Sequence, residues 1–270
     1  MSGQFYVSPE QLMKDRADFA RKGIARGRSL IAAEYDNGIA LVASNPSNTL
    51  SKLAEIYDRM AFAAVGKYNE FESLKIAGIR HADLKGFSYS RRDVTARSLA
   101  NAYAQTLGQV FTHETKPFEV EILVAEIAED PGGINQMYRI LYDGTVMDEH
   151  GFAVLGGQTD PIVAQMSRTH NVGDGRDTVV RTCAIALAGE SAPSAKQLEV
   201  CVLDHGNSPR TFQRLTFDEV DQILSGATPH IAADVEPGSG LANEDIDPSG
   251  RSGAPEGDSE TPGPGDDEQG

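Results

Sequence analysis

Apolar and polar positions along the chain predict strands that come in pairs and helices that come between them. The first element is a helix from Pro9 to about Ala25. Ser8 can cap its first turn, Pro9 suits the first helical position, and Gln11 stands where a capping box needs it. The apolar residues of this helix form a loose stripe among six Lys and Arg residues that reach just past its end. Such a helix packs poorly on its own body, so it is a candidate for contact with another subunit.

Two hairpins should follow the first helix. Apolar runs at 30–35 and 39–43 are joined by Asp36-Asn37-Gly38, and Asn-Gly between such runs predicts a type I′ turn with positive φ at both central residues. A second pair of runs lies at 53–57 and 60–65. The remaining expected elements are helices at about 69–84 (stopped by Gly86) and 92–112, strands at 118–127, 137–142, 145–147 and 152–155, two helices that start near Asp160 and Asp174, strands at 197–203 and 211–215, and a last helix at 217–224.

This order of elements predicts an α+β fold. Hairpins pair their strands antiparallel, and helix pairs between groups of strands indicate two stacked sheets with helices outside, a four-layer α-β-β-α sandwich. We expect the folded domain over residues 9–225, after a short N-terminal tail at 1–8. The C-terminal tail, 226–270, holds nine Gly and six Pro and lacks aromatic residues, so we expect it to be disordered.

Composition narrows the class of protein. Among 270 residues, 40 are acidic and 24 basic, a net charge of −16, with the excess concentrated in the C-terminal tail. This balance argues against nucleic acid as the main partner and against docking to anionic membranes. The N-terminus lacks the layout of a signal peptide, and the longest apolar runs are far shorter than a membrane span, so we expect a cytoplasmic protein. Cys183 and Cys201 lie in apolar stretches and should be reduced, buried thiols.

Motifs for catalysis or metal binding are missing from the sequence. The six His residues are scattered singly, and there is no GxSxG, HExxH, P-loop or GxGxxG. Asp148-Glu149-His150 is the densest group of possible ligands, but neighbours on an extended segment point to opposite sides. In Gly173-Asp174-Gly175-Arg176-Asp177 the two acidic residues would repel phosphate, so a helix start is the better interpretation. We therefore expect neither a metal nor a cofactor, and favour a subunit, a binding module or an enzyme relative that has lost its site.

Four long stretches carry a family resemblance: YVSPEQLMKDRADFARKGIARGRSLIA, YDNGIALVASNPSNTLSKLAEIYDRMAFAAVGKYNEFESL, RRDVTARSLANAYAQTLGQVFTHETKPFEVEILVAEI and VLGGQTDPI. Together they resemble the α-type subunits of the 20S proteasome, closest to the actinobacterial kind, over about residues 5–225. The resemblance implies the α-β-β-α fold of N-terminal-nucleophile hydrolases, which agrees with the expected layers. It also implies a heptameric α-ring that caps rings of β-type subunits.

The resemblance also bears on catalysis. In β-type subunits an N-terminal Thr is the nucleophile, supported by an Asp after the second strand and a Lys on the third. Arg28 matches the Thr here, Ser44 matches the Asp, and Glu55 lies near the Lys position. Arg28 cannot be a nucleophile, so we expect a non-catalytic subunit of a threonine-type endopeptidase complex.

Two other interpretations remain open at this stage. One is a stand-alone N-terminal-nucleophile hydrolase that uses Ser29 after processing. It would need a basic partner that the match does not supply, and the well-capped helix before Ser29 lacks the loose composition of a propeptide. The other is a monomeric binding protein with the same fold.

A gate is the first function that the resemblance implies for an α-ring. The N-terminal tails of the seven subunits converge over the axial pore, and seven copies of two aromatic residues could pack into a plug. The gate residues in this chain are Gln4, Phe5, Tyr6, Val7, Ser8 and Pro9.

Activator docking is the second implied function. Pockets between α-subunits accept the C-terminal tails of a AAA ring ATPase, and Lys52 matches the lysine that pairs with the terminal carboxylate. Gly66 and Lys67 match the opposing wall. The expected partners are therefore β-type proteasome subunits, further copies of this chain, and the tails of a ring ATPase that delivers substrates tagged with a small ubiquitin-like modifier.

Overall fold

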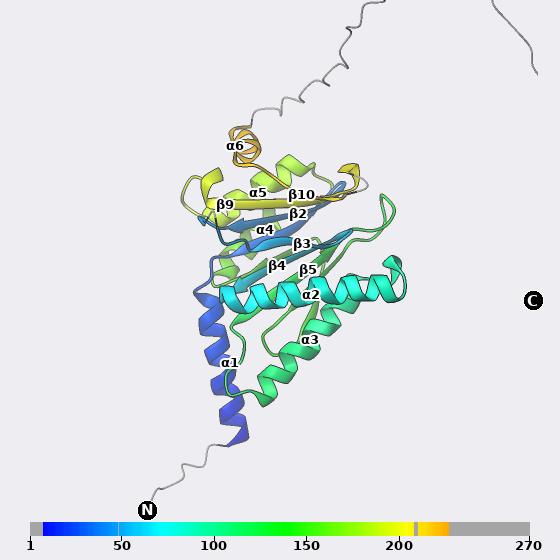
Figure 1. Cartoon of the computed structure of the whole chain (residues 1–270). Coiled ribbons are helices and arrows are strands. Elements are labelled where there is room, and N and C mark those ends of the chain that lie inside the picture. The colour runs from blue at the N-terminus through cyan, green and yellow to red at the C-terminus, as the bar shows by residue number, and fades with distance from the viewer. Residues whose placement is uncertain (1–7, 48, 208–209, 227–270) are drawn as a thin grey trace, which may run out of the picture. The chain divides into compact units, whose positions relative to one another are not determined.

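Two antiparallel five-stranded sheets stack face to face between layers of helices (Figure 1). The structure, a computed structural model, describes residues 8–47, 49–207 and 210–226. One sheet has the strand order β10-β9-β2-β1-β8 and the other β3-β4-β5-β6-β7. The strands are β1 (Leu30–Tyr35), β2 (Gly38–Ser44), β3 (Leu53–Tyr57), β4 (Met60–Gly66), β5 (Val120–Glu126), β6 (Gln136–Ile140), β7 (Val146–Glu149), β8 (Phe152–Leu155), β9 (Leu198–Asp204) and β10 (Phe212–Arg214).

Helices cover the outer face of each sheet (Figure 1). The α-helices of the described residues are α1 (Pro9–Ala25), α2 (Tyr68–Ser88), α3 (Ala96–His113), α4 (Thr159–Thr169), α5 (Arg176–Ala188) and α6 (Phe217–Ser225). The pair α2 and α3 packs on the sheet of β3 to β7, whereas α4 and α5 pack on the other sheet, with α6 against α5. The predicted α+β, four-layer α-β-β-α sandwich is confirmed.

Strand periodicity divides the core into layers. In β1, Leu30 and Ala32 belong to the apolar cluster between the two sheets, while Ile31 and Ala33 belong to the cluster under α4 and α5. Successive side chains of a strand point to opposite faces, so a strand buried on both faces must be apolar at every position. A third cluster fills the space between the second sheet and α2 and α3. This explains the continuous apolar runs that marked the central strands.

The first helix packs on the sandwich with its C-terminal part only. Ala20 and Ile24 are its buried residues, whereas Leu12 and Phe19 are 44% and 46% exposed. Ser8 caps the helix as predicted, since its hydroxyl accepts from the Gln11 N–H at 3.3 Å. The reciprocal half of the predicted capping box is wrong, because the Gln11 side-chain amide donates to Asp15 instead, at 2.6 Å. The weak attachment of α1 to its own body agrees with the loose apolar stripe.

Two glycines have roles other than those predicted. The first hairpin forms, but Tyr35 pairs with Gly38, so Asp36 and Asn37 are the turn residues and Gly38 does not have a positive φ. A Cβ on Gly38 would lie 1.9 Å from the Leu203 carbonyl oxygen of the neighbouring strand. Gly86 does not stop α2, which continues to Ser88; a Cβ there would lie 2.1 Å from the hydroxyl oxygen of Tyr57. Both glycines permit a close approach of another element.

The helix predicted at 92–112 begins later than the periodicity indicated. A 3-10 turn spans Arg91–Asp93, and α3 starts at Ala96 with Thr95 as its cap. Thr95 and Ser98 form a reciprocal capping box, each side chain bonding the backbone of the other. The cap, rather than the apolar pattern, sets the start of this helix.

The two cysteines are buried and unpaired, as predicted. Burial raises the pKa of both thiols to about 12, so they are unreactive at neutral pH. Among the described residues, no cluster of His, Cys, Asp and Glu is arranged to hold a metal ion. None of the helices in that part of the chain has the length and apolarity to cross a membrane.

Candidate functional site

Three chain segments meet at one end of the sandwich, where β1 begins, β2 ends and β3 begins. The ammonium of Lys52 joins them, since its Nζ donates to the Arg28 carbonyl oxygen at 2.7 Å and to the Ser44 carbonyl oxygen at 3.0 Å. The resemblance matched Arg28 and Ser44 to the Thr and the Asp of β-type subunits. The lysine beside them is Lys52.

The structure places Lys52, and not Glu55, beside these two residues. Glu55 lies three residues further along β3, and its carboxylate accepts from the Arg210 guanidinium at 3.2 Å. The length of the link between β2 and β3 cannot be read from an apolar pattern, so the sequence match across this link was displaced by three residues, from Lys52 to Glu55. Ser29 does have a basic side chain near it, because Lys52 contacts the peptide group that precedes this serine.

Lys52 is half-buried, and its surroundings change the pKa of its ammonium group. Burial lowers its pKa to about 8, with the Glu199 carboxylate opposing the shift and the Arg28 guanidinium adding to it. The side chain is thus an ammonium at neutral pH that loses its proton in mildly alkaline solution. A desolvated ammonium of this kind gains strongly from a carboxylate partner.

Gly66 lies at the same end of the sandwich. The Lys52 carbonyl oxygen accepts from the Ala64 N–H at 3.1 Å, which places Lys52, the residue before β3, beside the last residues of β4. The loop after α1 bridges the gap, since a Cβ on Gly27 would lie 3.2 Å from the Gly66 nitrogen. The structure therefore brings Lys52, Gly66 and the 26–28 loop together.

Lys67 occupies the outer edge of this region. Its backbone N–H donates to the Glu119 carbonyl oxygen at 2.9 Å, and its Nζ lies 3.6 Å from the Glu70 carboxylate. Glu70 also pairs with Lys116. Half of the Lys67 side chain is exposed.

Gly66 is needed by the sheet itself. It has a φ of 121°, and a Cβ would lie 2.0 Å from the Glu119 carbonyl oxygen. We expect Gly66→Ala to lower the melting temperature strongly, because both the strain and the clash act on backbone that cannot move aside. Gly132→Ala is the matched control: its φ of 82° adds the strain, but its Cβ would meet nothing within 4 Å. Equal losses for the two variants in thermal unfolding would contradict this role.

The predicted gate residues fall largely outside the described residues. Residues Gln4 to Val7 lie outside the described part of the chain, whereas Ser8 caps α1 and Pro9 is its first residue. A helix of 17 residues is about 25 Å long, so Ser8 lies far from the 26–28 loop. Ser8 and the Lys52 region are therefore at opposite ends of α1.

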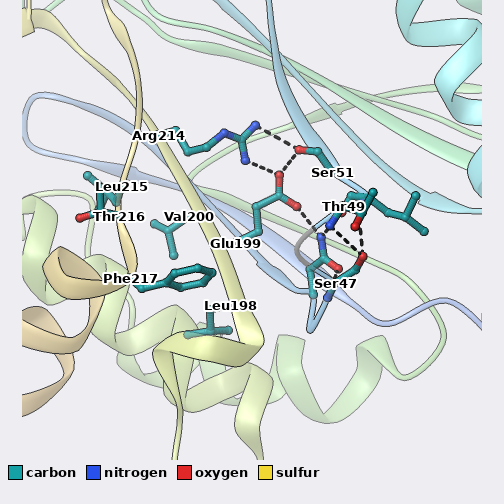
Figure 2. Close-up of a pocket in the computed structure, with 12 residues that line it drawn as sticks. Ser47, Thr49, Ser51, Leu198, Glu199, Val200, Arg214, Leu215, Thr216 and Phe217 are labelled. Atoms are coloured by element: carbon teal, nitrogen blue, oxygen red, sulfur yellow. Dashed lines mark hydrogen bonds and ion pairs between the residues drawn. The ribbon is translucent and has the colours of Figure 1, made fainter.

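A second feature near Lys52 was missed from the sequence. A cavity of about 400 Å³ lies between the link of β2 and β3, the strands β9 and β10, and the start of α6 (Figure 2). Glu199 lies in it and accepts hydrogen bonds from Ser51 and Arg214. The available signal was Glu199, a carboxylate at the second position of β9, followed by the apolar run at 200–203.

The fold and this junction together define the class of protein. Two antiparallel sheets between helical layers, with the start of β1, the end of β2 and the start of β3 meeting at one end, form a sandwich of the N-terminal-nucleophile hydrolase type. The model of the family described as proteasome subunit matches residues 24–203. The chain belongs to the proteasome subunit family, and its relatives place it among the α-type subunits.

These relatives are actinobacterial proteins similar to this chain over most of its length. A proteasome subunit alpha of Acidimicrobium ferrooxidans is 58% identical over 225 residues, which cover 83% of this chain and 97% of the relative. A proteasome subunit alpha of Sanguibacter keddieii is 53% identical, with 88% and 95% covered. One from a Nocardioides species is 51% identical, with 93% of this chain and 100% of the relative covered. The resemblance found from the sequence is confirmed.

Proposed function

We propose that this chain is a non-catalytic subunit of a heptameric α-ring in the 20S proteasome core, which gates substrate entry and docks a ring ATPase. The observation that supports it best is the continuity of α1 with Arg28. A capped helix whose Ala20 and Ile24 belong to the core between the sheets leads directly to the position that would hold a nucleophile. That position is Arg28, which carries a guanidinium side chain and lies in the segment that connects α1 to β1.

Loss of α1 would be the consequence of any processing at this link. Cleavage at the peptide bond between Arg28 and Ser29 would release the helix and expose the apolar residues that Ala20 and Ile24 cover. A subunit that keeps α1 keeps a surface for its neighbours in a ring. Leu12 and Phe19, both exposed on α1, supply apolar area for such a contact.

Lys52 favours one alternative, the stand-alone hydrolase that uses Ser29. Its ammonium donates to the Arg28 carbonyl oxygen, which belongs to the bond that processing would break. Against this, the Arg28 carbonyl and the Ser29 backbone are held in the strand junction, where Ser29 accepts from the Ser44 N–H at 3.0 Å. The same lysine serves the docking role without any cleavage.

Intact mass and activity separate the two functions. We expect the purified chain to begin at Met1 or Ser2, and Ser29→Ala to leave peptide hydrolysis by the assembled particle unchanged. Arg28 is not a nucleophile and Ser29 is not a new N-terminus, so neither residue has a reaction to lose. A mass that begins at Ser29, together with loss of hydrolysis in Ser29→Ala, would support the hydrolase.

Docking is the part of the proposal that rests on side-chain chemistry. A ring ATPase tail ends in a carboxylate, and the half-buried Lys52 ammonium lies between the Arg28 and Ser44 carbonyl oxygens, at the end of the sandwich where Gly66 ends β4. A charge-assisted hydrogen bond in such a place is roughly twice as strong as a neutral one. The contact would be made from one wall of a pocket between adjacent α-subunits.

The remaining parts of the proposal concern organisation. We assign residues 1–8 to the gate, 9–225 to the α-type domain and 226–270 to a disordered acidic tail. The partners are β-type subunits, other copies of this chain and the tails of the ring ATPase, in cytoplasmic breakdown of substrates tagged with a small ubiquitin-like modifier. The support for these assignments is the resemblance to actinobacterial α-subunits.

A further inference from the structure

Glu199, the second residue of β9, directs its carboxylate at the segment that carries Lys52. One oxygen, Oε2, accepts from the Lys52 backbone N–H at 2.9 Å and from the Asn45 side-chain amide at 2.8 Å. The other, Oε1, accepts from the Leu53 N–H at 3.2 Å, the Ser51 hydroxyl and the Arg214 guanidinium. Figure 2 shows the carboxylate between Arg214 and Ser51. One side chain thus fixes three successive residues before and at the start of β3.

This carboxylate stays charged although it is buried. Its side chain is 9% exposed, and burial alone would raise its pKa. The hydrogen bonds from Ser51, the Lys52 N–H, Arg214 and Asn45 outweigh that effect and hold the pKa of Glu199 below its ordinary value. A buried carboxylate with five donors is costly to assemble, and its partners are what make it stable.

We propose that Glu199 is the positioning residue of the docking lysine: its carboxylate clamps residues 51–53 so that the Lys52 ammonium lies between the Arg28 and Ser44 carbonyl oxygens, where a tail carboxylate can reach it. The proposal rests on the docking role of Lys52. The effect of Glu199 reaches the tail through Lys52.

The clamp has two consequences for Lys52, one of geometry and one of charge. Removing the carboxylate leaves the backbone donors of Lys52 and Leu53 unpaired, so the link between β2 and β3 shifts. It also removes the negative charge that opposes the lowering of the Lys52 pKa, while the Arg28 and Arg214 guanidiniums stay nearby. Lys52 then loses its proton at a lower pH. A residue that only stabilised the fold would not move this titration.

Glu199→Gln tests the clamp with little change in shape. Four of the five groups around the carboxylate can only donate, so the amide NH2 of a glutamine faces donors and finds an acceptor in the Ser51 hydroxyl alone. Ser51→Ala is a milder second variant, because it removes one of the five donors and leaves both backbone bonds. Glu55→Gln is the matched control: it removes a carboxylate on β3 that pairs with Arg210 and does not contact the clamp.

The experiment uses assembled particles and two readouts. The first is the pH dependence of Lys52 acylation by an amine-reactive ester, followed by peptide mass spectrometry, which reports the lysine without any partner. The second is peptide hydrolysis stimulated by the purified ring ATPase. In the unaltered particle the acylation midpoint is expected near the pKa of about 8. Glu199→Gln should lower it by about one unit, which at pH 8 reduces the protonated fraction and the stimulation about fivefold. Ser51→Ala should shift both readouts less, and Glu55→Gln should shift neither.

The outcomes separate the clamp from the docking role beneath it. An unshifted midpoint and full stimulation in Ser51→Ala and in Glu199→Gln, with stimulation lost in Lys52→Ala, would overturn the clamp and leave docking intact. Stimulation retained in Lys52→Ala would overturn docking itself, whatever the acylation shows. If Glu199→Gln does not assemble, Ser51→Ala decides: a midpoint equal to that of the unaltered particle overturns the proposal.

Discussion

Deletion of residues 2–7 is expected to raise the hydrolysis of short peptides by the assembled particle severalfold. The segment contains Phe5 and Tyr6, and seven copies brought together at the pore reach an effective concentration at which two aromatic residues each can pack into a plug. Removing it opens the pore while Ser8 and Pro9 still begin α1. The measurement is the initial rate with a fluorogenic tripeptide, compared at equal particle concentration.

A matched variant shows whether the plug or the mere length of the segment matters. Substituting Phe5 and Tyr6 together by Ala keeps the length and removes the aromatic packing, so it should reproduce most of the increase. Deletion of residues 260–270, in the acidic C-terminal tail, should leave the rate unchanged. A rate unaffected by the loss of residues 2–7, in particles of normal mass, would contradict the gate.

Lys52→Ala is expected to abolish stimulation by the ring ATPase and to leave basal peptide hydrolysis intact. A hydrogen bond between charged partners contributes about 1.5–3 kcal/mol, which corresponds to about a 10- to 100-fold loss of affinity for each tail. Several tails bind one ring, so the losses multiply in the avidity of the complex. Lys75→Ala, which removes a lysine paired with Glu72 on α2, should change neither rate.

The same lysine predicts how stimulation depends on pH. Burial lowers the pKa of Lys52 from 10.5 to about 8, so the ammonium is complete below pH 7 and disappears as the pH rises through 8. A bound carboxylate raises that pKa again, so the affinity should fall gradually from pH 8 upward while basal hydrolysis follows its own profile. Stimulation that stays constant to pH 10, as for a solvated lysine, would contradict the assignment.

Local rules predicted the elements of this fold well. Ser8 and Pro9 marked the start of α1, and the two-residue hairpins appeared where polar turn residues separated apolar runs. Burial on both faces of β1, β2 and β4 made most of their positions apolar, which indicated stacked sheets between helices. These features depend on neighbours in sequence.

Features that depend on distant neighbours were predicted less well. Gly38 and Gly86 are glycines because Leu203 and Tyr57 approach them, which no local pattern reveals. The sequence placed Glu55, rather than Lys52, near the lysine position of β-type subunits, because the β2–β3 link has no periodicity from which its length could be counted. Glu199 contacts Lys52 from 147 residues away along the chain, so only the folded chain shows the clamp.

Native mass spectrometry tests the α-subunit account most directly. The chain is measured alone and after co-expression with its β-type partner, and each fraction is assayed with a fluorogenic peptide. We predict an inert chain when it is alone and, after co-expression, a particle of α and β rings that cleaves the peptide. A stable monomer that does not associate with the β-type partner would contradict the account. Peptide cleavage by that monomer would support the hydrolase that uses Ser29.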